Sequence, residues 1–476
     1  MIDVTNDKRR VAIIGGGISG LTAAYYLQEQ AKSAQLPTEI VLIEASHRFG
    51  GKIQTIVEDG YQIEKGPDSF TDHKGTVATL AKKLKVEKQL VRSKEERKFV
   101  AVNEELHAVP KGVQFGIPTE MTPFLTSDLV SWSGKARATF DFLRPQGKMT
   151  EDQSLGQWVR QRLGGEVLEN LTEPLLSGIY NGDIDELSLQ AVLPFLSTHS
   201  KTSSGLIQSM KSYTRSSDYL TDAEQSFSFV GGLETFVDAL VHELTEVKLK
   251  KSVRVTNIQK SNHQLLLSLN NQSSIKADAV IIATSHTIAQ SLFHEKQLLQ
   301  ELDGIPLNTV ATVSLAFDET QIAHHFTGTD FVVSRNNDLS ITAATFMNRK
   351  WQGTVPDGKV LIKAYIGRVG DEAIVELSDK GIEKVVLQDL HRLVGITGAP
   401  EKVIVTRYKN AMPQYTIGHL ERVRKSKESL YEAYPTIRLI GNTYDGISIP
   451  KCVRQAIESA EQIMQELKDL PSFVIE

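Results

Sequence analysis

The chain has very little cysteine, no excess of positive charge and no long uninterrupted apolar run. Its one cysteine, Cys452, can close no disulfide within the chain and has no partner thiolates for a metal site, which indicates a reducing, cytoplasmic setting. The 53 lysines and arginines are outnumbered by 58 aspartates and glutamates, for a net charge of −5. This balance argues against a polynucleotide partner.

The composition is that of an ordinary folded protein. With 476 residues, 40% hydrophobic and 23% charged, the chain predicts two or three packed domains and no extensive disorder. Residues 11–27 carry no charge and follow three basic residues, which is similar to a secretion signal. However, three consecutive glycines interrupt the run, and a membrane helix needs about 20 apolar residues. The sequence therefore predicts neither export nor a membrane span.

The N-terminal region predicts a βαβ unit. Residues 10–14 form a short β-branched strand, a glycine turn follows, and an apolar helical face extends to Leu27. Residues 39–44 then form a second, nearly continuous apolar strand, as expected where both faces of a sheet are covered. The connection predicts a parallel sheet, so the fold class is α/β with a Rossmann-like domain.

The glycine turn has the pattern G-x-G-x-x-G. By itself this hexapeptide is equally consistent with a simple turn. Between a strand and a helix, however, the first glycine permits a tight turn, the second lets the backbone approach a pyrophosphate, and the third lets helix pack on strand. Glu44 follows Gly20 by 24 residues and suits a ribose hydroxyl, whereas its charge would repel a 2′-phosphate. These residues favour an unphosphorylated dinucleotide and leave NAD and FAD open.

The remaining chain alternates between helical and strand patterns. Residues 76–163 are mainly helical, with apolar loops near Phe115 and Phe124, and residues 200–228 are polar and predict a linker. Residues 253–258 and 265–269 predict a hairpin, and residues 279–283 a buried strand. Strands at 309–317 and 359–365 predict a second sheet. The C-terminal region predicts a strand, a loop and a helix, with Pro450 near the start of the helix and Ser448 available as its cap.

Three loops carry a resemblance to a known family. Residues 44–52, Glu-Ala-Ser-His-Arg-Phe-Gly-Gly-Lys, resemble the E-A-x-x-R-x-G-G-K segment of the flavin amine oxidase and protoporphyrinogen oxidase superfamily, whose members hold FAD. Residues 66–70 resemble the next flavin-contacting loop of its porphyrinogen-oxidising members. Residues 441–452 resemble the closing flavin motif, although Ser448 stands where relatives usually have glycine.

Further segments narrow the resemblance. Residues 173–183, followed by Leu187 and Ser188, are similar to a substrate-side segment of the coproporphyrinogen III oxidases of the Gram-positive type. Residues 230–233, 412–415 and 418–419 match as well, whereas Tyr408 stands where the family has tryptophan. The resemblance extends from about residue 10 to residue 465. An amine oxidase or carotenoid desaturase would share the flavin motifs and lack the segment at 173–183.

The resemblance implies a fold, a cofactor and its ligands. It implies a discontinuous FAD-binding domain made of residues 1–80, 226–300 and 430–476, a helical lobe at 81–225 and a mixed-sheet substrate-binding domain at 301–429. The residues that it implies in FAD binding are Gly15, Gly16, Gly17, Ile18, Ser19, Gly20, Glu44, Ala45, Arg48, Gly51, Lys52, Gly66, Pro67, Asp68, Ser69, Val255, Tyr408, Ile447, Ser448 and Ile449.

The implied activity is the oxygen-dependent oxidation of coproporphyrinogen III to coproporphyrin III in haem synthesis, with hydride transfer to FAD and release of hydrogen peroxide. Protoporphyrinogen IX is the nearest alternative substrate, because the two substrates share the macrocycle. From another class, a non-catalytic flavin-binding partner of a haem-synthesis enzyme also fits. The resemblance leaves the oligomeric state and peripheral membrane contact open.

No side chain is singled out as the catalyst. Electron-rich pyrroles help a hydride to leave, so positioning and an apolar pocket matter more than a strong acid or base. The histidines lack ligand spacing, no metal site is predicted, and each of the following is interpreted as a surface or core residue: His73, His199, His242, His286 and His419. Because the substrate carries four propionates, Lys74, Arg97 and Lys98 are candidates for the pocket rim.

Overall fold

The computed structural model describes residues 8–94, 97–143, 151–194, 196, 206–207, 210, 225–294, 297–323 and 326–469. The predicted N-terminal unit is present as β1 (Arg9–Ile14), α1 (Ile18–Ala34) and β2 (Thr38–Ile43), with β1 and β2 parallel. His199 and most of the predicted linker at 200–228 lie outside the described residues.

A five-stranded parallel sheet forms the centre of the first layer. Its order is β11 (Val247–Lys250), β2, β1, β15 (Ala279–Ile282) and β21 (Ile437–Leu439). Strands far apart in the chain thus become neighbours, which the α/β prediction requires. The fold class is confirmed: an α/β protein with a Rossmann-like sheet and a second, mixed sheet.

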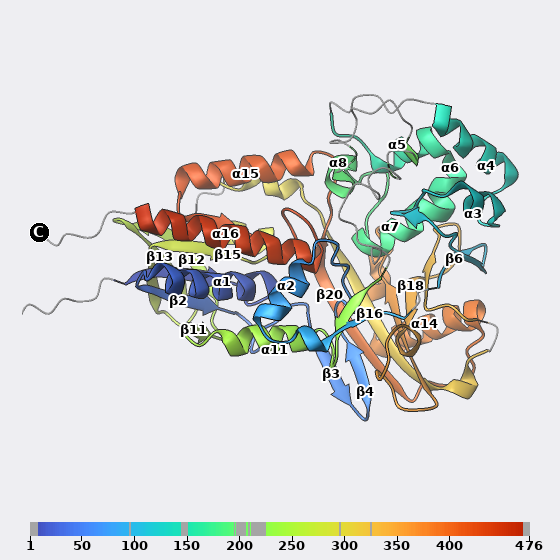
Figure 1. The fold of residues 1–476 in the computed structure, drawn as a ribbon, viewed down its shortest axis with the longest axis horizontal. Helices are drawn as coiled ribbons and strands as arrows, with labels where there is room; N and C mark the ends of the chain where they lie inside the picture. The colour runs from blue at the N-terminus through green and yellow to red at the C-terminus, as the bar shows by residue number, and fades with distance from the viewer. Residues whose placement is uncertain are drawn as a thin grey trace, which may run out of the picture.

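The inner strands β1, β2 and β15 each supply two cores because successive side chains point to opposite faces. Val11 and Ile13 pack with α1, α11 (Glu234–Glu243) and α16 (Ile449–Asp469), whereas Ala12 and Ile14 pack with the hairpin strands and α15 (His419–Ala433). Helices α1 and α16 run side by side over the first face (Figure 1). The continuous apolar strands of the sequence are explained by this double coverage.

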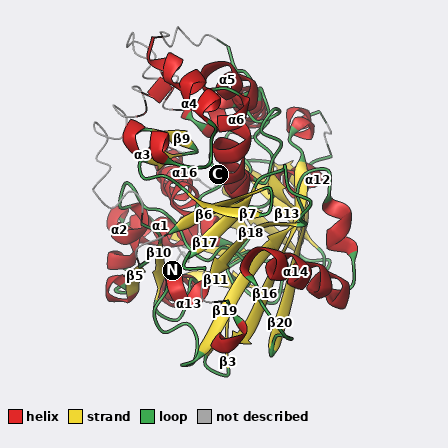
Figure 2. Ribbon diagram, turned by 90° about the vertical axis from the view of Figure 1, so that its right-hand side faces the viewer, coloured by secondary structure: helices red, strands yellow, loops and turns green. Residues whose placement is uncertain are grey.

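The second sheet has seven strands and is mixed. Its order is β20 (Lys402–Pro413), β16 (Leu307–Asp318), β19 (Lys359–Ile366), β18 (Ile341–Phe346), β17 (Asp330–Val333), β6 (Lys98–Val102) and β7 (Glu105–Ala108). Ala364 and Ile366 face the core beneath α14 (Asp379–Val394), the helix seen across the sheet in Figure 2. The opposite face of β19 carries Lys363 and Tyr365, and it meets the first layer.

A group of helices lies beyond the second sheet, at the upper right of Figure 1. It contains α3 (Met121–Thr126), α4 (Trp132–Thr139), α5 (Leu155–Leu163), α6 (Gly165–Val167), the π-helical turn Leu168–Thr172, α7 (Glu173–Tyr180) and α8 (Leu189–Val192). Phe124 is fully buried in its core. The range expected to be helical also contributes β6 and β7 to the second sheet, because β6 pairs with β17 and β7 pairs with β6.

The remaining elements are short or peripheral. They are β3 (Thr55–Glu58), β4 (Tyr61–Glu64), α2 (Thr76–Lys83), β5 (Leu90–Arg92), β8 (Val113–Gln114), β9 (Ile117–Pro118), β10 (Phe227–Phe229), β12 (Val255–Ser261), β13 (Gln264–Leu269), β14 (Ser274–Ala277), α12 (His286–Ser291) and α13 (Met347–Lys350), with 3₁₀ turns at Glu87–Gln89, Phe140–Leu143, Gln300–Gly304, Glu319–Gln321 and Glu372–Glu376. Within the described residues, no helix has the length and apolarity needed to span a membrane.

Candidate cofactor and active site

The glycine turn between β1 and α1 has the geometry that its pattern predicts. Gly15 has φ +105°, where an added Cβ would lie 2.8 Å from the carbonyl oxygen of Ala283. A Cβ on Gly20 would overlap the carbonyl oxygen of Gly15, so the third glycine lets the helix pack on the turn. At Gly17 the nearest atom to an added Cβ is the Cα of Gly51, 4.0 Å away. The backbone at the start of α1 is therefore open on the side that a pyrophosphate would approach.

Glu44 lies at the mouth of this turn, directly after β2. Its carboxylate accepts the backbone N–H of Gly16 at 2.6 Å and that of Ser46 at 2.7 Å. Two carboxylate oxygens offer about four acceptor positions, so these bonds leave room for a ribose hydroxyl. Val253 and Lys250 hold the Glu44 backbone through hydrogen bonds of 3.0 and 2.8 Å, which brings the segment before Val255 beside it.

The second glycine loop is joined to the first. Gly50 donates its N–H to the carbonyl oxygen of Gly16 at 2.8 Å, and Gly17 and Gly50 form a parallel bridge. Arg48 turns back onto its own loop: its guanidinium donates to the carbonyl oxygen of Ile53 at 2.6 Å and pairs with Glu234 at 2.8 Å. Arg48 and the segment at 230–234 thus shape the loop together.

Lys52 and Gly66 bring the third loop to the same place. A Cβ on Gly66 would overlap the carbonyl oxygen of Lys52, so only glycine fits there. The Tyr408 hydroxyl lies 3.5 Å from that oxygen, and Lys52 Nζ donates to the carbonyl oxygen of Ala411. Burial lowers the pKa of Lys52 to about 8. Strand β20 of the second sheet therefore contacts the junction of the two loops.

A buried group of charges lies where the second sheet meets the loop at 66–69. Lys363 is 1% exposed and donates from Nζ to the carbonyl oxygen of Gly66. Although burial opposes ionisation, Lys350 and Lys363 hold the pKa of Asp68 below its usual value. Asp68 also accepts a hydrogen bond of 2.7 Å from the Ser69 hydroxyl. Positive charges from β19 and from helix α13 (Met347–Lys350) thus fix the loop.

Three more polar residues complete this buried group. Tyr365 hydrogen-bonds Asp68, and Asp330 lies 3.5 Å from Lys350 Nζ. Burial raises the pKa of Glu64 to about 7, and its carboxylate accepts the N–H of Leu233 at 2.7 Å. The sequence prediction missed Lys350 and Lys363. A lysine inside the apolar strand at 359–366 was the available signal, because a charge there must find a buried partner.

Tyr415 supports the loop of residues 441–448, called the closing loop below, which leads into α16. Its hydroxyl donates to the carbonyl oxygen of Asn442 at 2.7 Å and accepts the N–H of Gly446 at 2.8 Å. His419 stacks on the Tyr415 ring with centroids 3.9 Å apart, and its Nε2 lies 2.9 Å from the carbonyl oxygen of Tyr444. Tyr415 and His419, which lie in the matching segment at 412–419, therefore support the closing loop.

The helix predicted at the end of the chain begins at Ile449. The carbonyl oxygen of Ser448 accepts the N–H of Cys452 at 3.0 Å, which places Ser448 at the cap position. Ile447 packs toward the helical lobe and Ile449 toward the α1 core. Burial raises the pKa of the Cys452 thiol to about 11.

The predicted cations and two of the predicted histidines differ in how far they are exposed to solvent. Lys74 is exposed in the loop before α2, and Arg97 and Lys98 are exposed at the start of β6. His242 is exposed, whereas His286 is buried within the first layer. Among the described residues, no group of three or more His, Cys, Asp and Glu side chains could hold a metal ion.

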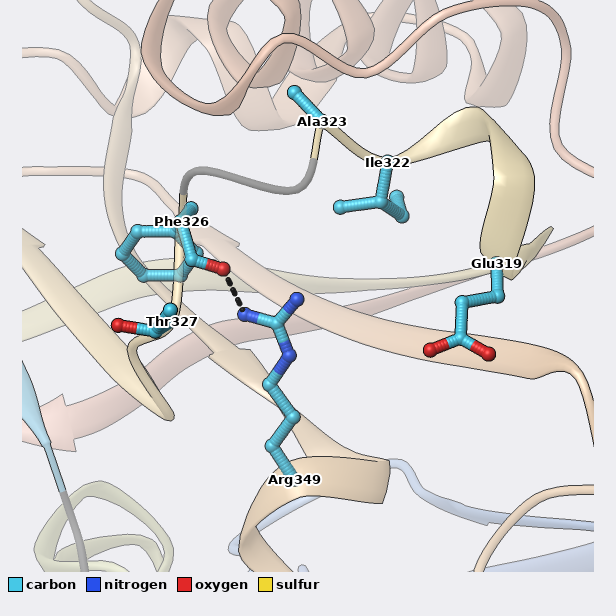
Figure 3. A pocket seen from close by; sticks show the side chains of 6 residues that line it. All are labelled: Glu319, Ile322, Ala323, Phe326, Thr327 and Arg349. Atoms are coloured by element: carbon cyan, nitrogen blue, oxygen red, sulfur yellow. Dashed lines mark hydrogen bonds between the residues drawn. The ribbon is translucent and has the colours of Figure 1, made fainter.

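A cavity of about 280 Å³ lies beside the turn at Glu319–Gln321 (Figure 3). Arg349 lines it, donates to the carbonyl oxygen of Phe326 at 2.8 Å and lies over the Phe346 ring at 4.5 Å. None of the residues of the glycine loops or of the closing loop lines this cavity. We therefore assign it no part in the cofactor site.

The geometry defines a dinucleotide-binding protein whose loops converge at the edge of a parallel sheet. The family model described as "Flavin containing amine oxidoreductase" matches residues 18–464. The chain belongs to this flavin oxidoreductase family, and FAD is its cofactor.

Relatives cover nearly the whole chain. A Bacillus subtilis protein named coproporphyrinogen III oxidase is 43% identical over 456 residues, 95% of this chain and 97% of its own length. A Staphylococcus aureus protein of the same name is 36% identical, over 96% of this chain and all of its own length. A crystal structure from Exiguobacterium sp. 255-15, whose name is that of a protoporphyrinogen oxidase, has a TM-score of 0.85 and 33% identity, covering 96% and 99% of the two chains.

Glu44→Ala is expected to weaken FAD binding roughly tenfold to a hundredfold, because one charge-assisted hydrogen bond contributes about 1.5–3 kcal/mol. The measurement is the flavin retained by purified protein together with a titration of apoprotein with FAD. Glu44→Gln keeps one acceptor oxygen for the Gly16 amide and should bind FAD with intermediate affinity. An unchanged flavin content in Glu44→Ala would contradict the ribose assignment.

His419 is expected to make the protein less stable in acid. Burial lowers the pKa of His419 to about 4, below the value of about 6.5 for an unfolded chain. The unfolded state therefore binds more protons between these values, so the free energy of unfolding falls as pH drops from about 6.5 to about 4. The contribution reaches up to about 3 kcal/mol. Urea unfolding at pH 7 and pH 5 should show a smaller pH dependence in His419→Phe than in the exposed control His242→Phe.

Proposed function

We propose that this chain oxidises coproporphyrinogen III to coproporphyrin III in haem synthesis, with FAD as electron acceptor and O₂ as the final oxidant, releasing hydrogen peroxide. The main support is the 43% identity to a relative with this name over nearly the whole of both chains. The placement of α7 against the second sheet, beyond the loop at 66–69, supports a substrate site between these elements.

We propose that FAD is held by the loops that converge around Gly17. Gly15, Gly17 and Gly20 shape the turn, Glu44 takes the ribose, and the segment leading to Val255 lies on the adenine side. The loops at 48–52, 66–69 and 447–449, with Tyr408, enclose the rest of the dinucleotide. When bound, FAD supplies a two-electron acceptor for a hydride from the substrate.

The chain's own residues position the reactants rather than act as strong acids or bases. Lys363 and Asp68 hold the loop at 66–69 against the second sheet, and Tyr415 holds the closing loop. The start of α16 presents the positive end of a helix dipole, which stabilises negative charge placed there. The electron-rich pyrroles delocalise the positive charge left by a departing hydride, so orientation supplies much of the rate.

The same proposal includes the domain arrangement. Residues 1–80, 226–300 and 430–476 form the FAD-binding domain, residues 81–225 the helical lobe and residues 301–429 the substrate-binding domain, with β6 and β7 contributed by the lobe to the substrate sheet. The single cysteine supports a cytoplasmic location.

An aerobic assay tests this proposal. Purified, FAD-loaded protein is supplied with coproporphyrinogen III or protoporphyrinogen IX, and porphyrin fluorescence and hydrogen peroxide are followed. We expect a higher kcat/KM with coproporphyrinogen III and three peroxides for each porphyrin, since six hydrogens leave. A preference for protoporphyrinogen IX would favour that alternative. Flavin-loaded protein that oxidises neither substrate would favour a non-catalytic flavin-binding partner.

A further inference from the structure

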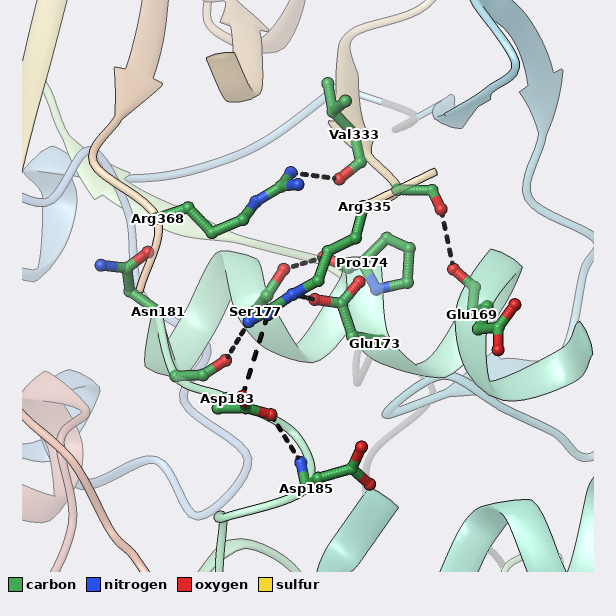
Figure 4. Close-up of polar contacts among 12 residues, drawn as sticks. Glu169, Glu173, Pro174, Ser177, Asn181, Asp183, Asp185, Val333, Arg335 and Arg368 are labelled. Atoms are coloured by element: carbon green, nitrogen blue, oxygen red, sulfur yellow. Dashed lines mark hydrogen bonds and ion pairs between the residues drawn. The ribbon is translucent and has the colours of Figure 1, made fainter. Parts of the chain in front are cut away.

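Two arginines from the second sheet meet the first turn and the end of α7 (Figure 4). Arg335 follows β17, and its Nε donates to Glu173 Oε1 at 2.8 Å. Its Nη2 lies 3.3 Å from the carbonyl oxygen of Gly182, and its Nη1 lies 3.9 Å from Asp183. Arg335 is thus oriented from two sides by the segment 173–183, and about a third of its side chain remains exposed.

Arg368 approaches the same segment from β19. It follows Gly367, whose φ of +95° turns the chain, and the carbonyl oxygen of Gly367 accepts a hydrogen bond of 2.9 Å from Asn181. Arg368 donates from Nη2 to the carbonyl oxygen of Val333 at 2.9 Å. A guanidinium carries five N–H donors. Among the described residues, the bond to Val333 is the one hydrogen bond that the Arg368 side chain donates. Burial lowers the pKa of Arg368 although Glu173 opposes this effect.

Glu173 is the buried carboxylate between the arginines and α7. It is 4% exposed, and its Oε2 has no hydrogen-bond partner among the described residues. Burial raises the pKa of Glu173 although Arg335 and Arg368 oppose this effect. Two guanidiniums therefore face one buried carboxylate, and Asp183 is more exposed and more distant. Asp371 also acts on Arg368, so acidic side chains balance the two positive charges, and what the guanidiniums retain is unused hydrogen-bonding capacity.

The cluster lies within reach of the cofactor side of the sheet. Tyr365, which hydrogen-bonds Asp68 of the loop at 66–69, precedes Arg368 by three residues. Three residues of chain span at most about 10 Å. A propionate arm of a tetrapyrrole placed between that loop and α7 could extend to the arginines. Ile179 on α7 is 47% exposed and supplies an apolar surface in the same segment.

We propose that Arg335 and Arg368 form a binding site for a propionate carboxylate of the porphyrinogen. The inference rests on the proposed function, since it names the residues that bind the acidic arms of that substrate. The planar guanidinium matches a carboxylate through paired hydrogen bonds, and both arginines are already oriented by the protein. Glu173 is a positioning residue that holds Arg335. These residues differ from Lys74, Arg97 and Lys98, the cations that the sequence indicated.

Binding of the oxidised product tests the site without turnover. FAD-loaded wild type, Arg335→Gln and Arg368→Gln are titrated with coproporphyrin III and with its tetramethyl ester, which lacks the negative charges, and fluorescence quenching is measured. Each variant should bind the acid roughly tenfold more weakly, because a charge-assisted hydrogen bond is lost. The ester should bind all three proteins equally. Arg335→Lys keeps the charge and should recover part of the affinity.

Arg407→Gln is the matched control. Arg407 lies on β20 and donates to the carbonyl oxygens of Val375 and Leu377, on the face opposite to its neighbour Tyr408. This variant should bind acid and ester as the wild type does. In steady-state assays, the two cluster variants should raise KM for coproporphyrinogen III roughly tenfold and change kcat less than twofold.

Two results would overturn the inference. The first is an unchanged ratio of acid to ester affinity in both variants of the cluster. The second is equal weakening for acid and ester with a lower melting temperature, because the arginines would then only fasten α7 to the sheet. Failure of the proposed function is separate: wild-type protein would bind FAD and leave coproporphyrinogen III unoxidised.

Discussion

Gly17→Val is expected to abolish FAD binding and leave the protein folded. Gly17 has φ −75°, which any residue adopts, and an added Cβ meets no atom closer than 4.0 Å. The valine side chain would instead occupy the space before the α1 amides. Losing two hydrogen bonds to a charged pyrophosphate costs about 3–6 kcal/mol, or roughly a hundredfold or more in affinity. Titration of apoprotein with FAD measures this loss.

Comparison with Gly20→Val distinguishes a loss of cofactor binding from a loss of folding. At Gly20 an added Cβ overlaps the carbonyl oxygen of Gly15, so the substitution should disrupt the turn itself and lower the stability of the apoprotein. Thermal unfolding of the two apoproteins should therefore differ, with Gly17→Val close to wild type and Gly20→Val well below it. Normal FAD affinity in Gly17→Val would contradict the placement of the pyrophosphate at α1.

Lys363→Met is expected to destabilise the protein by about 1.5–3 kcal/mol, because the buried carbonyl oxygen of Gly66 loses a charged donor and the Asp68 and Glu64 carboxyls lose a nearby positive charge. Methionine keeps the apolar stem and removes the ammonium group that lies beside Asp68 and Glu64. Both carboxyl groups are buried. Their pKa values should rise in the variant, so it should lose stability as pH increases from acidic to neutral, where they must ionise. Urea unfolding at pH 5 and pH 7 measures both effects.

A surface lysine provides the comparison. Lys402 pairs with Glu58 at 3.0 Å and Asp59 at 2.9 Å near the surface, where such pairs contribute about 0–1 kcal/mol. Lys402→Met should therefore change stability little. Adding Asp68→Asn to Lys363→Met should recover part of the lost stability because Asp68, with only Lys350 of its two lysines left to act on it, no longer has to ionise. Equal effects of Lys363→Met and Lys402→Met would contradict a buried ion network at the loop.

The parts of the fold that local pattern controls were predictable from the sequence. Strands β1 and β2, the turn at Gly15 and helix α1 follow from short-range periodicity and from glycine geometry, and the structure has them at the expected positions. The start of α16 near Pro450 was predictable for the same reason. Conversely, β6 joins the second sheet by pairing with β17, more than two hundred residues away, and carries its neighbour β7 with it, and no local pattern encodes that partner.

The candidate site likewise contains residues whose proximity the sequence predicts and residues whose partners it does not predict. The glycines and Glu44 lie in continuous motifs, so their proximity could be predicted. Lys363 lies on β19 and Arg368 just after it, and the carboxyls that act on them, Asp68 and Glu173, come from distant segments. Long-range electrostatic pairing of this kind depends on the tertiary fold. The sequence therefore indicated Lys74, Arg97 and Lys98 for the substrate arms, whereas our proposal places two arginines beside α7 there.

Anaerobic mixing tests the central claim, that the converged loops present FAD to a coproporphyrinogen. FAD-loaded protein is mixed with coproporphyrinogen III or protoporphyrinogen IX in the absence of oxygen, and the visible absorbance of the flavin is followed in a single turnover. The account predicts rapid bleaching with coproporphyrinogen III and recovery of the colour when oxygen is admitted. Flavin that keeps its colour with coproporphyrinogen III, or bleaches faster with protoporphyrinogen IX, would contradict it.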